Sequence, residues 1–173
     1  GTNEPIIFLM GVLIKWNDDN LEYRPYLVKQ LNKHSENEML KEGLDFLSGL
    51  GKDTPIFHWS SAEPNMLKKA GWSLPANCYW VDLYTHFLKN EATIPGCYTY
   101  GLKDVASTLY KLKKIQSSWL HGLDGTSAMV MAWNIDHKCS ITGERFDQDS
   151  RIKKLCDYNY VDCVVMAEIR KLL

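Results

Sequence analysis

Residues 6–14 read Ile-Ile-Phe-Leu-Met-Gly-Val-Leu-Ile, an apolar stretch with no helix-start signal. Such a run is typical of a strand that is buried on both faces, near the middle of a sheet. Turn-forming residues follow at 17–20, and residues 21–29 form a second expected strand. That second strand contains Pro25, which lacks an N–H and therefore favours a sheet edge. The stretch thus predicts a hairpin of one central and one edge strand, with a further strand beside the central one.

The remaining elements follow from spacing and turn residues. A capping box, Ser35-x-x-Glu38, predicts a helix start, and glycines at 49 and 51 predict its end. Further along, we expect a strand at 54–59, a helix at 60–70, a strand turning into a helix at 78–87, a helix at 102–114, a short helix at 126–133, a polar loop at 134–150 and a terminal helix at 155–172. This order predicts a single α/β domain over residues 1–173.

Composition excludes several classes of protein. The 173 residues are 45% apolar with a net charge of −1, which excludes wholesale disorder and a bulk basic nucleic-acid binder. No apolar run is long enough to span a membrane. The five cysteines include no C-x-x-C pair, which argues against a disulfide scaffold or a zinc site. We therefore expect reduced thiols in a cytoplasmic or nuclear protein.

Three acidic residues occupy positions that point to chemistry. Asp162 shares the buried stripe of the terminal helix, where a carboxylate is costly unless it is paired or bound to a metal. Glu63 and Asp82 each follow an expected strand, where open α/β sheets place ligands. Each acid also has a structural alternative: a solvent-reaching or arginine-paired Asp162, a capping box Ser60-x-x-Glu63, and a helix cap at Asp82. Together they suggest a site for Mg²⁺ or Mn²⁺, which prefer carboxylate oxygens.

The tail Tyr158-Asn159-x-x-Asp162-Cys163 resembles the third motif of DEDD-type 3′–5′ exonucleases of the RNase H-like superfamily, in their Tyr-x-x-x-Asp branch. The residues of this motif, Tyr-Asn-x-x-Asp-Cys, are similar to those of a subgroup of predicted RNase H-like nucleases found beside RecB-type modules and in large DNA viruses. Four other segments resemble that subgroup in the same order, at residues 8–12, 56–63, 102–106 and 119–133. The resemblance covers nearly the whole chain and implies a mixed sheet flanked by helices.

The resemblance also implies roles for individual residues. Asp162 and Glu63 would be metal ligands, and Tyr158 would orient the attacking water in a two-metal mechanism. Asp82 is a third metal-ligand candidate from its position after an expected strand, apart from the resemblance. From residue type and position alone, three further residues are candidates for nucleic-acid contacts, with the alternative that they serve only the core or a solvated face: His58 at a phosphate, Trp59 under a base and Lys103 along the backbone.

Two departures from the family pattern matter. Glu63 stands where the superfamily usually has Asp. The first motif, Asp-x-Glu on a central strand, is not found ahead of residue 6. We therefore expect the domain to be incomplete at its N-terminal end, with its central first strand missing, and to be part of a larger protein. The 173 residues alone are expected to show weak activity or none.

Three functions follow as hypotheses. The first is a metal-dependent nuclease, a 3′–5′ exonuclease on single-stranded DNA or a 3′ end, with RNA also open, working beside a helicase or another nuclease module. The second is an inactive RNase H-like binding or scaffolding module. A thiol- or zinc-based enzyme is a third, with no Cys–His spacing to support it.

Overall fold

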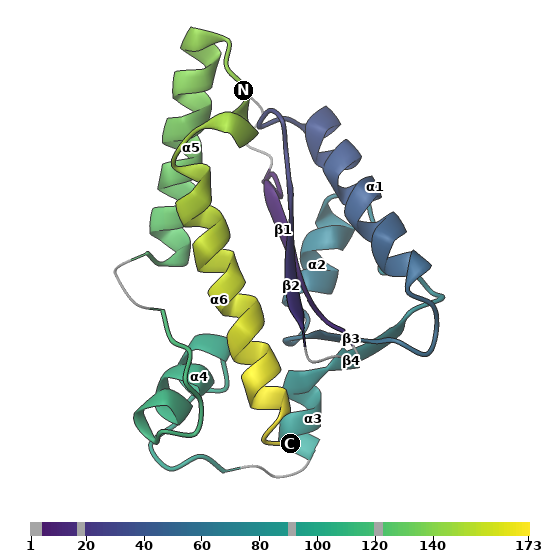
Figure 1. Ribbon diagram of the computed structural model, residues 1–173, viewed down its shortest axis with the longest axis vertical. Coiled ribbons are helices and arrows are strands. Elements are labelled where there is room, and N and C mark those ends of the chain that lie inside the picture. The colour runs from purple at the N-terminus through teal and green to yellow at the C-terminus, as the bar shows by residue number, and fades with distance from the viewer. Residues whose placement is uncertain (1–4, 17–19, 90–92, 120–122) are drawn as a thin grey trace. The chain divides into compact units, whose positions relative to one another are not determined.

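The computed structural model describes residues 5–16, 20–89, 93–119 and 123–173. The protein is a mixed α/β chain, as the sequence predicts (Figure 1). Its elements are β1 (Leu9–Lys15), β2 (Leu21–Leu27), α1 (Lys33–Gly49), β3 (Pro55–His58), α2 (Ala62–Lys69), β4 (Tyr79–Asp82), α3 (Leu83–Lys89), α4 (Leu102–Lys111), α5 (Gly125–Thr142), the 3-10 turn η1 (Phe146–Gln148) and α6 (Ile152–Arg170). None of the helices in the described ranges has the length and apolar character that crossing a membrane requires.

The chain divides into two compact units. Unit 1 comprises Gly1–Phe46 and His121–Tyr160, and unit 2 comprises Leu47–Leu120 and Val161–Leu173. Helix α6 is continuous and contributes its first half to unit 1 and its second half to unit 2. The single domain expected from the sequence stays a prediction.

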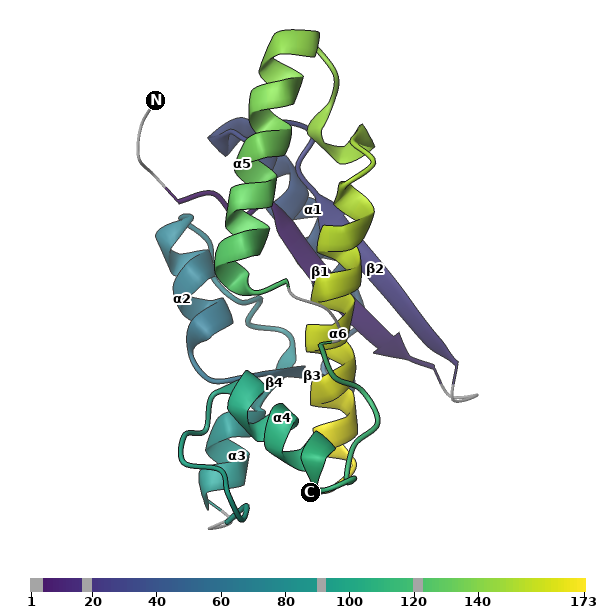
Figure 2. The ribbon, with the colours of Figure 1, turned by 90° about the vertical axis from the view of Figure 1, so that its left-hand side faces the viewer.

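In unit 1, the antiparallel hairpin β1–β2 presents two different faces. On one face, Gly43 of α1 leaves space that Met10 and Tyr26 fill. On the other face, a side chain at Gly11 would lie 1.7 Å from the Asn159 amide oxygen of α6, so this strand position must lack one. The hairpin therefore lies between α1 and α6, with α5 beside α6 (Figures 1 and 2).

The hairpin confirms one strand prediction and corrects another. Within the described residues β2 pairs only with β1, so the edge position expected from Pro25 is confirmed. The expectation that the first strand is buried on both faces is met only in part, because residues 9–14 of β1 have a helix on each face but are half-buried. The physical reason is that one edge of β1 carries the ladder to β2, whereas no second ladder partner occurs among the described residues. The missing central strand stays a prediction.

Helix α5 corrects the prediction of a short helix followed by a polar loop. It continues to Thr142, because Ala132, Ile135 and Cys139 keep helical spacing on its inner face and are buried. Gly143 then ends the helix with a positive φ of 73°. The expected loop at 134–150 is therefore mostly helix, followed by η1, in which Phe146 is buried.

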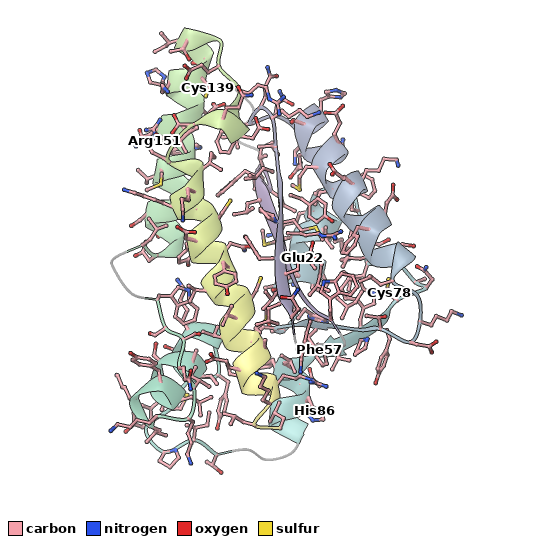
Figure 3. The ribbon with its side chains drawn as sticks, viewed as in Figure 1. Glu22, Phe57, Cys78, His86, Cys139 and Arg151 are labelled. Atoms are coloured by element: carbon pink, nitrogen blue, oxygen red, sulfur yellow. The ribbon has the colours of Figure 1, made fainter. Side chains whose placement is uncertain are left out.

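Unit 2 is built on the parallel pair β3–β4, which pairs Ile56 with Trp80 and His58 with Asp82. Its core joins the strand ends to α3, α4 and the second half of α6 through buried residues: Trp59, Leu83, Ile94, Val105, Ala106, Leu109, Ile115, Val165 and Ile169. On β3 the ring of Phe57, which Figure 3 labels, has its centroid 5.0 Å from the guanidinium carbon of Arg170, in the last turn of α6. The strand ends and the second half of α6 thus belong to one compact unit.

Candidate functional site

The carboxyl ends of β3 and β4 meet at one edge of the unit 2 sheet. His58 and Asp82 are paired in register there, and each strand leads directly toward a helix. Ser60 turns the chain between β3 and α2 with a positive φ of 61°, which is uncommon for a residue other than glycine. The backbone N–H of Ser60 donates to Asp82 Oδ1 at 2.8 Å, which ties the two strand ends together.

Asp82 has the geometry of a structural cap. Its carboxylate also accepts hydrogen bonds from the Tyr84 N–H at 3.0 Å and the Thr85 hydroxyl at 2.6 Å, in the first turn of α3. Burial raises the pKa of Asp82, but the hydrogen bonds from Thr85 and Ser60 outweigh it, so that the pKa falls below its usual value. Its structural alternative, a helix cap, matches this geometry, and its role as a metal ligand stays a prediction.

Glu63 lies in the first turn of α2 with its side chain 48% exposed. Ser61 is the N-cap of α2 and makes no side-chain capping bond, so the expected capping box starting at Ser60 is wrong. The pKa of Glu63 is raised, first because neighbouring protein displaces water from the carboxylate and further because Asp82 and Asp162 repel its charge. Its own backbone N–H and His58 lower the pKa in part.

His58 connects the strand end to Glu63. Its Nδ1 lies 2.8 Å from the Ser60 carbonyl oxygen, an acceptor, so Nδ1 carries the proton and donates it there. The same nitrogen lies 4.0 Å from the Glu63 carboxylate, and the side chain is only 12% exposed. This geometry satisfies the histidine locally, and its contact with a phosphate stays a prediction.

Asp162 comes to unit 2 from α6 and is half-buried, as the sequence predicts. The Trp119 indole N–H donates to its Oδ1 at 2.9 Å. Burial raises the pKa of Asp162, while the hydrogen bond from Trp119 and the charge of Lys103 lower it in part. Asp162 therefore has partners, but they are a tryptophan and a lysine rather than the arginine considered from the sequence.

The three acids predicted from separate segments all belong to unit 2, and two of them act on the third. Asp82 and Asp162 both raise the pKa of Glu63, and burial raises the pKa of the adjacent Cys163 thiol to about 12, with Asp162 and Glu63 adding to the effect. A thiol with so high a pKa carries no thiolate at neutral pH, which argues against Cys163 as a nucleophile.

Carboxylate oxygens are suitable donors for Mg²⁺, which proteins hold through one or two carboxylates together with water and substrate phosphates. Glu63 and Asp162 fit that donor set, since each has a raised pKa and each would gain from a neighbouring cation. In the described ranges, however, no three acidic, histidine or cysteine side chains converge closely enough to hold a metal among themselves.

The other residues singled out from the sequence lie as follows. Trp59 is 5% exposed and its indole N–H donates to the Tyr100 carbonyl oxygen, so its ring belongs to the core. Lys103 lies in the first turn of α4 with Nζ 5.7 Å from the Trp119 ring centroid. Tyr158 is half-buried, four residues before Asp162 on the same helix. Their roles toward nucleic acid or water stay predictions.

Trp119 is the contact residue that sequence reasoning missed. The sequence places it only within residues 119–133, a segment that resembles the nuclease subgroup, and no local pattern connects it to Asp162. The two residues are 43 positions apart in the chain, so only the folded unit brings them together.

Comparison with known proteins gives one match. A protein-family model described as RNase H superfamily matches residues 1–173, which is the whole chain. No curated protein and no solved structure matches it.

Proposed function

From the membership of this chain in the RNase H superfamily, we propose that it is a metal-dependent nuclease domain that removes nucleotides from the 3′ end of DNA. The superfamily implies a nucleic-acid substrate and, in general, a divalent metal such as Mg²⁺. One observation carries the proposal. Glu63, which follows β3, and Asp162, on α6, both belong to unit 2, and the charge of Asp162 adds to the raised pKa of Glu63. Three parts of the proposal follow from the resemblance alone: the direction of digestion from the 3′ end, RNA as an alternative substrate, and a helicase or nuclease partner.

Glu63 and Asp162 would hold the metal, which supplies charge stabilisation at the phosphoryl oxygens and an activated water. The chain's own residues would prepare the site. Tyr158 is one helical turn from Asp162 and would orient the water through its hydroxyl. Asp82 holds the turn after β3 through Ser60, and this fixes where α2 presents Glu63.

The test is a cleavage assay with the full-length protein, Mn²⁺ and single-stranded DNA labelled at either end. We expect shortening from the 3′ end that stops when the metal is chelated, and a loss of at least about 100-fold in Asp162→Ala and Glu63→Ala. Asp157→Ala is a matched control, because Asp157 lies on the same helix, is exposed and pairs with Lys153. Equal cleavage by wild-type protein and Asp162→Ala would contradict the proposal.

A second candidate function is an RNase H-like module that binds nucleic acid without cutting it. The observation that favours it is the lack of a three-ligand metal cluster in the part of the chain that the structure describes. In this case the full-length protein would bind labelled DNA, and Mn²⁺ would produce no shortened products.

A further inference from the structure

Residues 115–119, which follow α4, are fastened to α6 in unit 2. Ile115 is 5% exposed within the core, and the Glu168 carboxylate of α6 accepts three hydrogen bonds from the next two residues. These come from the Gln116 N–H at 2.9 Å, the Ser117 N–H at 3.0 Å and the Ser117 hydroxyl at 2.9 Å. The segment therefore has a defined path along the helix before it reaches Trp119.

Trp119 is the second point of attachment. Its indole N–H donates to Asp162 Oδ1 at 2.9 Å, six residues before Glu168 on α6, or about 9 Å along the helix axis. The Lys103 ammonium lies 5.7 Å from the ring centroid, within the range of a cation–π contact. Anchors at two heights on α6, with a cation beside the ring, restrict where the indole N–H points.

This restriction acts on the Asp162 carboxylate. The indole N–H holds Oδ1, and no described residue donates a hydrogen bond to Oδ2. A carboxylate with one oxygen fixed has fewer orientations to lose when the other binds a cation. Partners of this kind, which hold a ligand rather than the metal, typically change metal affinity by about 10- to 100-fold when they are removed.

We propose that Trp119 is a positioning residue for Asp162, and that its indole N–H fixes Oδ1 so that Oδ2 is the oxygen offered to a divalent cation. The proposal rests on the proposed function for the choice of cation and of Asp162 as its ligand. Lys103 supports the ring, and Glu168 supports the segment that carries it. Trp119 itself touches neither metal nor substrate in this role.

The first test measures Mn²⁺ binding by calorimetry, without DNA. Trp119→Phe keeps an aromatic ring and removes the donor, and we expect it to weaken Mn²⁺ binding about 10-fold or more. Trp80→Phe is the matched control, since Trp80 also loses one indole N–H bond, to the Pro75 carbonyl oxygen at 3.0 Å, in the same unit. That variant should bind Mn²⁺ within about 2-fold of wild type. Glu168→Ala should weaken binding in the same direction as Trp119→Phe, by a smaller factor.

The second test needs no variant to be active. The chain has six tryptophans, and the indole N–H resonance of Trp119 is identified as the one that Trp119→Phe removes from the NMR spectrum. We expect this resonance to move when Asp162 is replaced by asparagine and when Mg²⁺ is added to wild type. If Trp119→Phe does not fold, the same resonance is assigned in wild type from backbone connectivity, and its response to Mg²⁺ decides the matter.

The outcomes separate this inference from the proposed function. The positioning role is overturned if folded Trp119→Phe binds Mn²⁺ with unchanged affinity, or if the chemical shift of the Trp119 indole N–H does not change when Mg²⁺ is added. Weakened Mn²⁺ binding in Trp119→Phe supports it, even where the full-length protein cuts no DNA. That last result would count against the nuclease function alone.

Discussion

Replacing Asp149 by asparagine should lower the free energy of unfolding by about 2 kcal/mol at pH 7. The Asp149 side chain is 2% exposed and lies three residues before the first residue of α6, the helix that carries Tyr158 and Asp162. It accepts hydrogen bonds from Arg151 Nε at 2.8 Å, Arg151 Nη2 at 2.9 Å and Lys138 Nζ at 3.2 Å, and Figure 3 shows Arg151 at this end of α6. The substitution keeps the shape of the side chain and removes its charge.

The magnitude follows from burial. Breaking a buried ion pair by removing one partner costs about 3–5 kcal/mol, because the other charge is left buried. Here the Arg151 and Lys138 side chains are 35% and 47% exposed, so water solvates much of their charge once Asp149 is replaced by neutral asparagine. Asparagine also retains an oxygen for the Arg151 backbone N–H, which donates to Oδ1 at 2.9 Å. Both effects place the expected loss below the buried-pair range, near 2 kcal/mol.

The effect has a definite pH dependence. The side-chain hydrogen bonds from Arg151 lower the pKa of Asp149 well below its usual value, against the opposing effect of burial. A carboxyl whose pKa is lower in the folded state stabilises the fold fully above its unfolded pKa of about 3.9, and this stabilisation is lost as the pH falls toward the folded value. The gap between wild type and Asp149→Asn should therefore be constant from pH 7 to about pH 5 and narrow below about pH 4.

The assay is urea unfolding followed by far-ultraviolet circular dichroism, at neutral pH and at about pH 3. Asp157→Asn is the control, since its pair with Lys153 is exposed, and we expect a change within about 0.5 kcal/mol. A loss below about 0.5 kcal/mol for Asp149→Asn at pH 7, or a gap that does not narrow in acid, would refute the reasoning.

Two further predictions concern backbone space and charge. Gly11→Ala should lower the free energy of unfolding in urea by about 1–3 kcal/mol, because the new Cβ would lie 1.7 Å from the Asn159 amide oxygen. Gly49→Ala is the control and should cause no such loss, because a Cβ at Gly49 would have nothing within 4 Å. Equal losses of stability in the two variants would contradict this prediction. Asp162→Asn should stabilise the metal-free chain at neutral pH, since its raised pKa marks a charge that folding disfavours, and Asp82→Asn should destabilise it, since its pKa is lowered. Thermal unfolding in chelator checks the opposite signs, and shifts in the same direction would contradict them.

The sequence predicted the order of the elements better than their ends. The alternation of strand and helix signals placed β3, α2, β4 and α3 close to where they occur, because these short elements are punctuated by turn residues. The helix predicted from Ser35 is present but begins at Lys33, and Ser35 does not form the predicted capping box. The backbone N–H of Ser35 donates a hydrogen bond to the Asn32 side-chain oxygen at 2.9 Å. The Ser35 hydroxyl oxygen accepts a hydrogen bond from the Lys29 backbone N–H, at 2.8 Å, rather than from the first turn of the helix. A capping box depends on which residue the chain turns at, and spacing alone does not determine that turn.

The site was predictable to a similar degree. Asp162 could be found because a carboxylate on an apolar helical stripe conflicts with its surroundings, and that conflict is visible in the sequence. Trp119 could not be found, since its contact with Asp162 crosses 43 positions and depends on how residues 115–119 fold onto α6. Long-range hydrogen bonds to one residue leave no periodic signal, so the partners of a candidate side chain such as Asp162 are the part of the candidate site that only the structure provides.

Glu63 and Asp82 were indistinguishable as candidates, because each is an acid at the end of a strand and the start of a helix. Their electrostatics now separate them. Asp82 already receives N–H and O–H donors on both oxygens and has a lowered pKa, so a cation would have to compete with those donors. Glu63 has a raised pKa through loss of water and repulsion by two acids, so a cation would relieve an existing cost. Asp162 shares that property. If a divalent metal binds in unit 2, the free energy to be gained therefore lies at Glu63 and Asp162, while Asp82 is worth more to the fold as the cap of α3 that also holds the turn before α2.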